Sequence, residues 1–173
     1  RTDQPLLFVT ITQNSHYPWV PLPTVVDDWR TLNTPVAGPA VALEAPSEPN
    51  LKRQNYMQAI EYELRMLTGF IQQTKDRPSL FILVGDHQPP QVSRRSDGWE
   101  TPIHIISQDQ ALLDEFGEYG FTPGLEVASL DATLHHEGFY SLFVRVMQDQ
   151  TENNRLALPN FLPNGIIPGQ PIL

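Results

Sequence analysis

Two short, strongly apolar runs most constrain the fold of this 173-residue chain. Residues 6–12 (LLFVTIT) and 79–84 (SLFILV) are rich in leucine and β-branched residues, which is typical of buried strands. Neither run alternates between apolar and polar residues, so both faces of each strand need cover. We therefore predict an α/β fold whose mainly parallel sheet is covered by helices on both faces.

The remaining pattern supplies the helices for such a fold. Residues 53–74 form the strongest helical pattern, because their apolar side chains recur at three- and four-residue spacing before Pro78. A third strand is predicted over residues 102–107 (PIHIIS), and shorter helices over residues 108–116 and 132–147. The spacing thus predicts strand, helix, strand, strand, helix and helix.

The predicted domain covers residues 1–150, and a proline-rich tail covers residues 151–173. Residues 20–50, which are rich in Pro, Thr, Ala and Val, show no period and are expected to form an extended excursion. The chain begins at Arg1 without a leader pattern, which we interpret as a cut inside a longer chain. The sequence therefore predicts one domain of a larger parent.

Composition excludes several classes of function. The formal net charge of −9 disfavours non-specific binding to nucleic acid or to an anionic membrane, since both need clustered Lys and Arg. The chain has no cysteine, which excludes disulfides, a thiolate nucleophile and a zinc–sulfur site. No run approaches the roughly 18–20 apolar residues of a membrane span. Any span of a membrane-anchored parent is therefore expected upstream.

The candidate chemistry lies directly after the second apolar run, at Gly85-Asp86-His87 and the following Gln88-Pro89-Pro90. A carboxylate and an imidazole at a strand end can bind one divalent cation together. Gly85 allows a tight turn, and the two prolines stiffen the exit. The alternative is an aspartate that caps the next element beside a packed histidine.

The string LVGDHQPP resembles the metal-binding loop of the alkaline phosphatase/sulfatase superfamily. It is most similar to the membrane-anchored, sulfatase-like branch that includes phosphoglycerol and phosphoethanolamine transferases. In that branch an amphipathic helix precedes the loop, as residues 53–74 do here. A Ser/Asn-His-x-Pro segment lies further upstream, and Asn14-Ser15-His16-Tyr17-Pro18 matches it. The resemblance covers roughly residues 6–110 and indicates the C-terminal part of a catalytic domain.

This resemblance implies that Asp86 and His87 are metal ligands and that His16 contacts the phosphate or sulfate group of the substrate. The cofactor would be a divalent cation: manganese, zinc, magnesium or calcium. The substrate would be a phosphate or sulfate ester, free or linked to a lipid or glycan. The location would be extracytoplasmic, in the periplasm or at the outer face of the inner membrane. His16 could instead be a loop histidine bonded to backbone near Trp19.

Other histidines have two open interpretations each. His104 lies in the third apolar run and could line the site or be a core histidine. His135 and His136 are typical of a solvated or packed pair, but the superfamily's two-metal members use a late histidine, which keeps His136 in reserve as a ligand.

The covalent Ser or Thr nucleophile of this family, and a further acidic ligand, match no segment here. They would come from the upstream remainder of the catalytic domain, so we expect this segment to be inactive by itself. A glycine-rich phosphate loop and a Gly-x-Ser-x-Gly motif are also missing from the sequence. Two hypotheses follow: a metal-dependent hydrolase or transferase of phosphate or sulfate esters, or a non-catalytic domain of this type that binds a partner or glycan.

Overall fold

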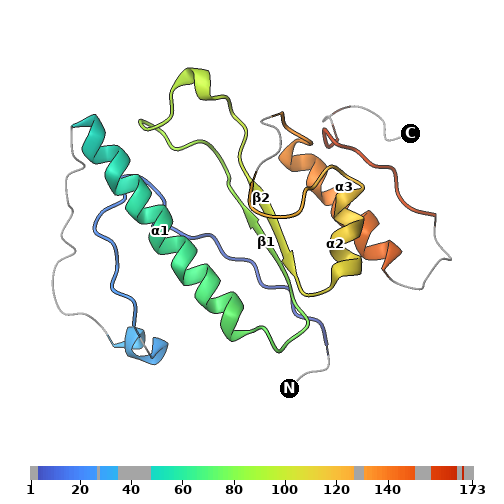
Figure 1. The fold of residues 1–173 in the computed structure, drawn as a ribbon, viewed down its shortest axis with the longest axis horizontal. Coiled ribbons are helices and arrows are strands. Elements are labelled where there is room, and N and C mark those ends of the chain that lie inside the picture. The colour runs from blue at the N-terminus through green and yellow to red at the C-terminus, as the bar shows by residue number, and fades with distance from the viewer. Residues whose placement is uncertain are drawn as a thin grey trace. The chain divides into compact units, whose positions relative to one another are not determined.

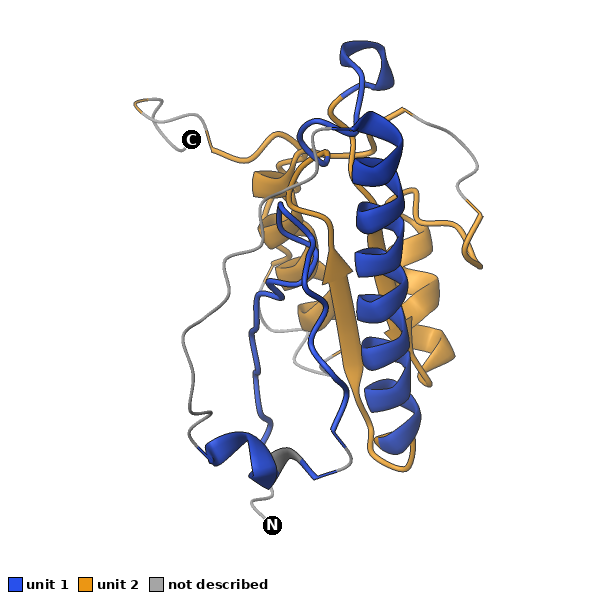
Figure 2. Ribbon diagram, turned by 90° about the vertical axis from the view of Figure 1, so that its left-hand side faces the viewer, with its two compact units in different colours: residues 1–73, 89–98 blue, residues 74–88, 99–173 orange. Residues whose placement is uncertain are grey.

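The computed structural model describes residues 4–26, 28–34, 48–126, 131–150, 157–166 and 169 (Figure 1). These residues belong to two compact units (Figure 2). The first unit comprises residues 1–73 and 89–98 and contains the long helix α1, while the second comprises residues 74–88 and 99–173.

The helix α1 (Pro49–Gln73) dominates the first unit and confirms the predicted helix, with an earlier start. Its first turn is capped because a carboxylate oxygen of Glu48 accepts a hydrogen bond from the Leu51 amide at 2.8 Å. Pro49 occupies the first helical position, where its missing N–H costs nothing. Its buried residues recur every four positions, at Asn55, Ala59 and Glu63, and so define one face of the helix.

A loop in the same unit is fixed to α1 through Trp19, whose side chain is 3% exposed. The indole N–H donates to the Ser15 carbonyl at 2.8 Å. The indole ring makes edge-on contacts with Tyr17 and with Tyr56 of α1, at centroid distances of 5.1 and 5.5 Å. Burial raises the pKa of the Tyr56 hydroxyl. Trp19 therefore anchors the turn that carries His16.

The second unit is built on a hairpin of β1 (Leu80–Val84) and β2 (Ile103–Ser107). The strands are antiparallel, and their register places Leu80 opposite Ser107 and Val84 opposite Ile103. Both strands were predicted from the sequence. The end of β1 that leads into Gly85 thus lies beside the start of β2.

Two helices supply the core of this unit. The helix α2 (Gln110–Gly117) is capped by Asp109, whose carboxylate accepts from the Leu112 amide at 3.2 Å. The helix α3 (His136–Asp149) begins four residues later than residue 132, the predicted start. The buried side chains lie at four-residue spacing on both helices; they are Leu112, Phe116, Leu142 and Val146.

The predicted mainly parallel sheet with helices on both faces is wrong. The strands of the described residues form one antiparallel pair. The connection over residues 85–102 contains only the short helix η2 (Arg95–Asp97), whereas neighbouring parallel strands need a long crossover, usually through an α-helix. The core of α2 and α3 packs against Leu80 and Ile105, which lie on one face of the hairpin.

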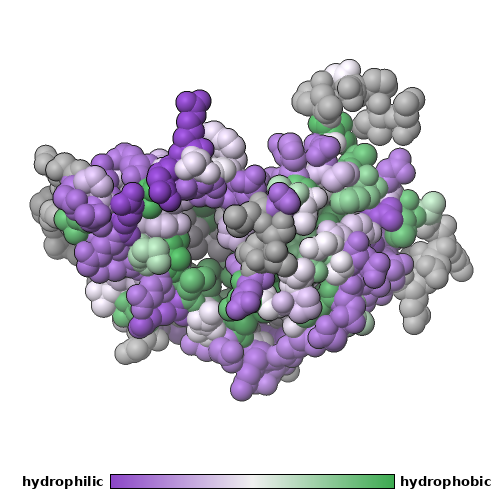
Figure 3. All heavy atoms as spheres, turned by 45° about the horizontal axis from the view of Figure 1, so that its top comes forward, coloured by the Kyte–Doolittle hydropathy of each residue, from purple (hydrophilic) through white to green (hydrophobic). Residues whose placement is uncertain are grey.

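The predicted strand over residues 6–12 is also wrong. This segment forms no strand, and the side chains of Leu6, Leu7 and Val9 are 88, 85 and 76% exposed. A strand needs a neighbouring strand for its N–H and C=O groups, and an apolar composition cannot specify that neighbour. Figure 3 shows hydrophobic residues between hydrophilic ones on one face of the surface.

Parts of two further predictions lie outside the described residues. Of the expected excursion over residues 20–50, residue 27 and residues 35–47 are outside, and the described part contains the short helix η1 (Trp29–Asn33). Of the expected tail, residues 157–166 and 169 are described. None of the described helices is both long and apolar enough to be a membrane span.

Candidate functional site

The Gly85-Asp86-His87-Gln88 loop follows β1 and fixes its two candidate ligands through local hydrogen bonds. One carboxylate oxygen of Asp86, Oδ1, accepts from the His87 amide at 2.9 Å. The His87 ring nitrogen Nδ1 lies 2.9 Å from the Gln88 carbonyl oxygen. A carbonyl oxygen only accepts, so Nδ1 carries the hydrogen and Nε2 of the neutral ring keeps its lone pair. That Nε2 atom lies 3.6 Å from the second Asp86 oxygen, Oδ2.

This separation suits two ligands of one metal ion. Metal–oxygen and metal–nitrogen bonds of about 2.0–2.2 Å place adjacent ligand atoms roughly 2.8–3.6 Å apart, and the tetrahedral arrangement gives the longer separations. The side chains of Asp86 and His87 are 84 and 60% exposed, so an ion can reach them from solvent. A histidine ligand that donates its other N–H to a backbone carbonyl is the usual arrangement at metal sites.

The same geometry permits an ion pair if His87 gains a second proton. Because both side chains are largely exposed, such a pair would contribute little to stability. Within the described ranges, no group of three or more His, Cys, Asp or Glu side chains could hold a metal ion. Asp86 and His87 are therefore two candidate ligands, and a metal site would need further ligands from elsewhere.

The base of the loop is held by contacts within the second unit. The Gly85 amide donates to the Pro102 carbonyl at 3.0 Å, and the Gln88 side-chain amide donates to the Glu100 carbonyl. A Cβ atom at position 85 would lie 3.1 Å from Thr101 Cβ and 3.3 Å from Pro102 Cδ. Glycine at this position therefore allows the close approach of residues 101 and 102.

Of the other predicted histidines, His136 is brought to the base of this loop. Its Nε2 atom lies 2.9 Å from the Gly85 carbonyl oxygen, although 51 residues separate the two in sequence. His104 lies opposite Leu83, on the face of the hairpin away from Leu80 and Ile105, and is partly buried. Neither position makes the histidine a ligand by itself.

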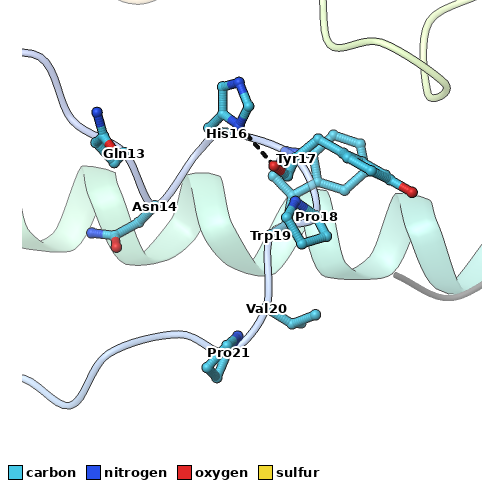
Figure 4. A pocket seen from close by; sticks show the side chains of 8 residues that line it. All are labelled: Gln13, Asn14, His16, Tyr17, Pro18, Trp19, Val20 and Pro21. Atoms are coloured by element: carbon cyan, nitrogen blue, oxygen red, sulfur yellow. Dashed lines mark hydrogen bonds between the residues drawn. The ribbon is translucent and has the colours of Figure 1, made fainter. Parts of the chain in front are cut away.

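His16 belongs to the first unit, where it lines a pocket of about 250 Å³ with Gln13, Asn14 and residues 17–21 (Figure 4). Its Nδ1 atom lies 2.7 Å from the Tyr17 carbonyl oxygen, shown by the dashed line in Figure 4. As at His87, this bond places the hydrogen on Nδ1 and leaves Nε2 of the neutral ring without one. Imidazole and amide groups can bind the oxygen atoms of a polar or anionic ligand.

Sequence reasoning missed two residues that shape the loop. The Thr101 hydroxyl donates to the Gly85 carbonyl at 2.6 Å, and Gln88 closes the connection at Glu100. No sequence pattern singles out Thr101, because its partner is 16 residues away. Gln88 stands next to the two candidate ligands, and its side-chain amide could have been considered from that position alone.

Comparisons of the chain with protein-family models, with curated proteins and with solved structures found no match.

Proposed function

We propose that this chain supplies part of a divalent-metal site to an enzyme that hydrolyses or transfers phosphate or sulfate esters. Asp86 and His87 would hold the ion, and manganese, zinc, magnesium or calcium are compatible with one carboxylate and one imidazole. The proposal places the chain in the alkaline phosphatase/sulfatase superfamily, in its membrane-anchored, sulfatase-like branch. The compartment it implies is extracytoplasmic.

One observation supports the metal proposal above the others: the His87 Nδ1–H bond to the Gln88 carbonyl. This bond leaves the lone pair of Nε2 free, 3.6 Å from Asp86 Oδ2. The bond from the His87 amide to Asp86 Oδ1 holds the carboxylate in place without using Oδ2. Two ligand atoms are thus prepared by contacts that lie entirely within residues 86–88.

The remaining roles are assigned by the chemistry of the groups. A bound ion would act as a Lewis acid and would activate a nucleophile supplied by another part of the enzyme. When protonated at Nε2, His16 would donate a hydrogen bond to an oxygen atom of the ester group. Gln13 and Asn14 would add amide donors in the same pocket. This chain alone is expected to bind the ion without catalysing the reaction.

Titration with Mn²⁺ tests the proposal. Calorimetry on the full chain should detect binding that Asp86→Asn and His87→Gln each weaken at least about tenfold, because each removes one of the two candidate ligands found among the described residues. Asp76→Asn, at another exposed aspartate, is the matched control and should bind as the wild type does. Mn²⁺ should also broaden the His87 ring resonances in NMR spectra more strongly than those of His135.

Two outcomes would contradict the metal assignment. One is a chain that binds none of the four cations; the other is a Kd that stays unchanged in Asp86→Asn. Either outcome would favour the alternative function, a domain that binds a partner or glycan. The His16 assignment is tested separately by titration with inorganic phosphate, which should shift the His16 ring resonances and the amide resonances of Gln13 and Asn14 in the same pocket. After His16→Ala the shifts of the Gln13 and Asn14 amides should disappear.

A further inference from the structure

The Gly85 carbonyl oxygen accepts hydrogen bonds from two side chains that are distant in sequence. Thr101 Oγ1 donates to it at 2.6 Å, and His136 Nε2 lies 2.9 Å from it. The two donor atoms are 3.3 Å apart, so they converge on one oxygen. A carbonyl oxygen has two lone pairs and no hydrogen. The oxygen is therefore saturated, and the His136 Nε2 atom carries a hydrogen.

We propose that His136 and Thr101 are positioning residues for the metal-binding loop, which rests on the function proposed above. The Gly85 carbonyl belongs to the same rigid peptide plane as the Asp86 amide, so fixing this oxygen fixes the direction in which the chain enters Asp86. The Gly85 amide is held on the other side by the Pro102 carbonyl at 3.0 Å. The amide and the carbonyl of Gly85 are thus both hydrogen-bonded within the second unit, directly before the candidate ligand Asp86 in the sequence.

His136 differs from His87 in the nitrogen atom that it uses. His87 donates through Nδ1 and keeps Nε2 free, whereas His136 donates through Nε2. The His136 Nε2 atom therefore cannot be a metal ligand while it is bonded to Gly85. The chemistry that position 136 needs is one N–H donor, and a glutamine side chain can also supply this.

Hydrogen bonds to residues 162 and 163 fix the first turns of α3, the helix that begins at His136. The His135 amide donates to the Pro163 carbonyl at 2.9 Å. Six residues later, Ser141 Oγ accepts from the Leu162 amide at 2.9 Å. Gly138 lies between these bonds, and a Cβ atom there would lie only 2.9 Å from the Leu162 carbonyl oxygen. Residues 161–165, which we call the strap, therefore pack directly on the first turn of α3.

Variants that remove or keep the hydrogen-bond donors at positions 101 and 136 distinguish a positioning role from direct metal binding. His136→Ala and Thr101→Val should each weaken Mn²⁺ binding about tenfold, which is the lower end of the effect of second-layer partners at metal sites. His136→Gln and Thr101→Ser keep a donor and should bind within about twofold of the wild type. His135→Gln is the matched control, since the backbone amide of His135, and not its ring, makes the hydrogen bond to the strap. All variants should melt within a few degrees of the wild type, because the His136 bond is exposed and the Thr101 bond is only partly buried.

A result in which His136→Gln binds as weakly as His136→Ala would overturn the proposal, because the imidazole itself would then be needed. Unchanged binding by His136→Ala would overturn it as well, while leaving the metal assignment intact if Asp86→Asn still weakens binding at least about tenfold.

The hydrogen positions provide a test that needs no metal. Long-range ¹⁵N–¹H spectra at a pH where the rings are neutral should show His136 as the Nε2–H form and His87 as the Nδ1–H form. The Nδ1–H form at His136 would refute the bond to Gly85. A chain that binds no Mn²⁺ but shows the expected forms would contradict the proposed function and retain the structural bond, so the two failures can be told apart.

Discussion

The packing of the strap on α3 leads to a sharp prediction for Gly138→Ala. Gly138 is buried in the first turn of α3, and its missing side chain leaves room for backbone atoms of the strap. An added Cβ would lie 2.9 Å from the Leu162 carbonyl oxygen and closer still to that of Pro163. Both obstacles are backbone atoms, which cannot rotate away as a flexible side chain could.

The magnitude follows from two opposing effects. Overpacking of a well-packed site costs typically 1–3 kcal/mol, whereas replacing glycine by alanine inside a helix contributes roughly 0.5–1 kcal/mol of stability. If the strap instead moves away, the bonds from the His135 and Leu162 amides are lost, at about 1 kcal/mol each. The first route gives a net destabilisation of about 0–2.5 kcal/mol and the second about 1–1.5 kcal/mol, so we expect a loss of roughly 1 kcal/mol.

Urea denaturation followed by circular dichroism measures this change in the free energy of unfolding. The matched control is Gly117→Ala in α2 of the same unit, where an added Cβ would have no atom within 4 Å. That variant should be as stable as the wild type or more stable. Hydrogen exchange at the Leu162 amide gives a local measure and should be faster in Gly138→Ala. If both alanine variants were equally stable, the argument from close packing would be refuted.

Two further predictions concern carboxylates. Burial, followed by the like charge of Asp149, raises the pKa of the Glu115 carboxyl in the folded state. Ionising Glu115 therefore lowers the free energy of unfolding. This stability is fully present below the unfolded-state pKa and is lost as the pH rises through the folded-state pKa. Glu115→Gln should therefore be more stable than the wild type by about 0.3 kcal/mol at pH 7, with no gain at pH 3.5; an equal difference at both pH values would contradict the assignment. Glu63 in α1 is 4% exposed, and neither carboxylate oxygen has a hydrogen-bond partner among the described residues. Glu63→Met should raise the free energy of unfolding by about 1 kcal/mol or more in urea, and a loss of stability would show that the carboxylate has a partner.

Elements with strong local signals were predictable from the sequence. The helix α1, the strands β1 and β2 and the helix α2 each have an apolar pattern and a capping residue, proline or glycine near one end. The start of α3 was placed four residues too early, because Leu134 extends the apolar pattern beyond the helix. Leu134 contacts the core from outside α3, so apolar periodicity did not mark the boundary.

Strand pairing could not be predicted in this way. The runs over residues 6–12 and 79–84 have similar compositions, yet only the second forms a strand, through Leu80–Val84. The difference lies in whether a partner is present: β1 has residues 103–107 beside it, in a register from Leu80–Ser107 to Val84–Ile103. Apolar strands indicate burial on both faces, but the direction of pairing depends on the connection between the strands.

The candidate site divides in the same way. Asp86 and His87 were recognisable because they are adjacent in sequence, and the bonds that prepare them lie within residues 86–88. Thr101 and His136 act on Gly85 across 16 and 51 residues, so their convergence follows from the antiparallel register and the packing of α3. Sequence could name His136 as a candidate but could not show which atom it would contact.

The metal proposal does not depend on the predicted parallel sheet, because the contacts that position Asp86 and His87 are not contacts of a sheet. The sheet argument placed ligands at the carboxyl ends of parallel strands, and the antiparallel pairing removes it. The bond from His87 Nδ1 to the next residue's carbonyl, however, spans one residue and needs no sheet. His16 makes the same bond to Tyr17 in the other unit. In each histidine a local hydrogen bond from Nδ1 leaves the Nε2 lone pair of the neutral ring unprotonated. The binding properties of His87 and of His16 can therefore be measured separately.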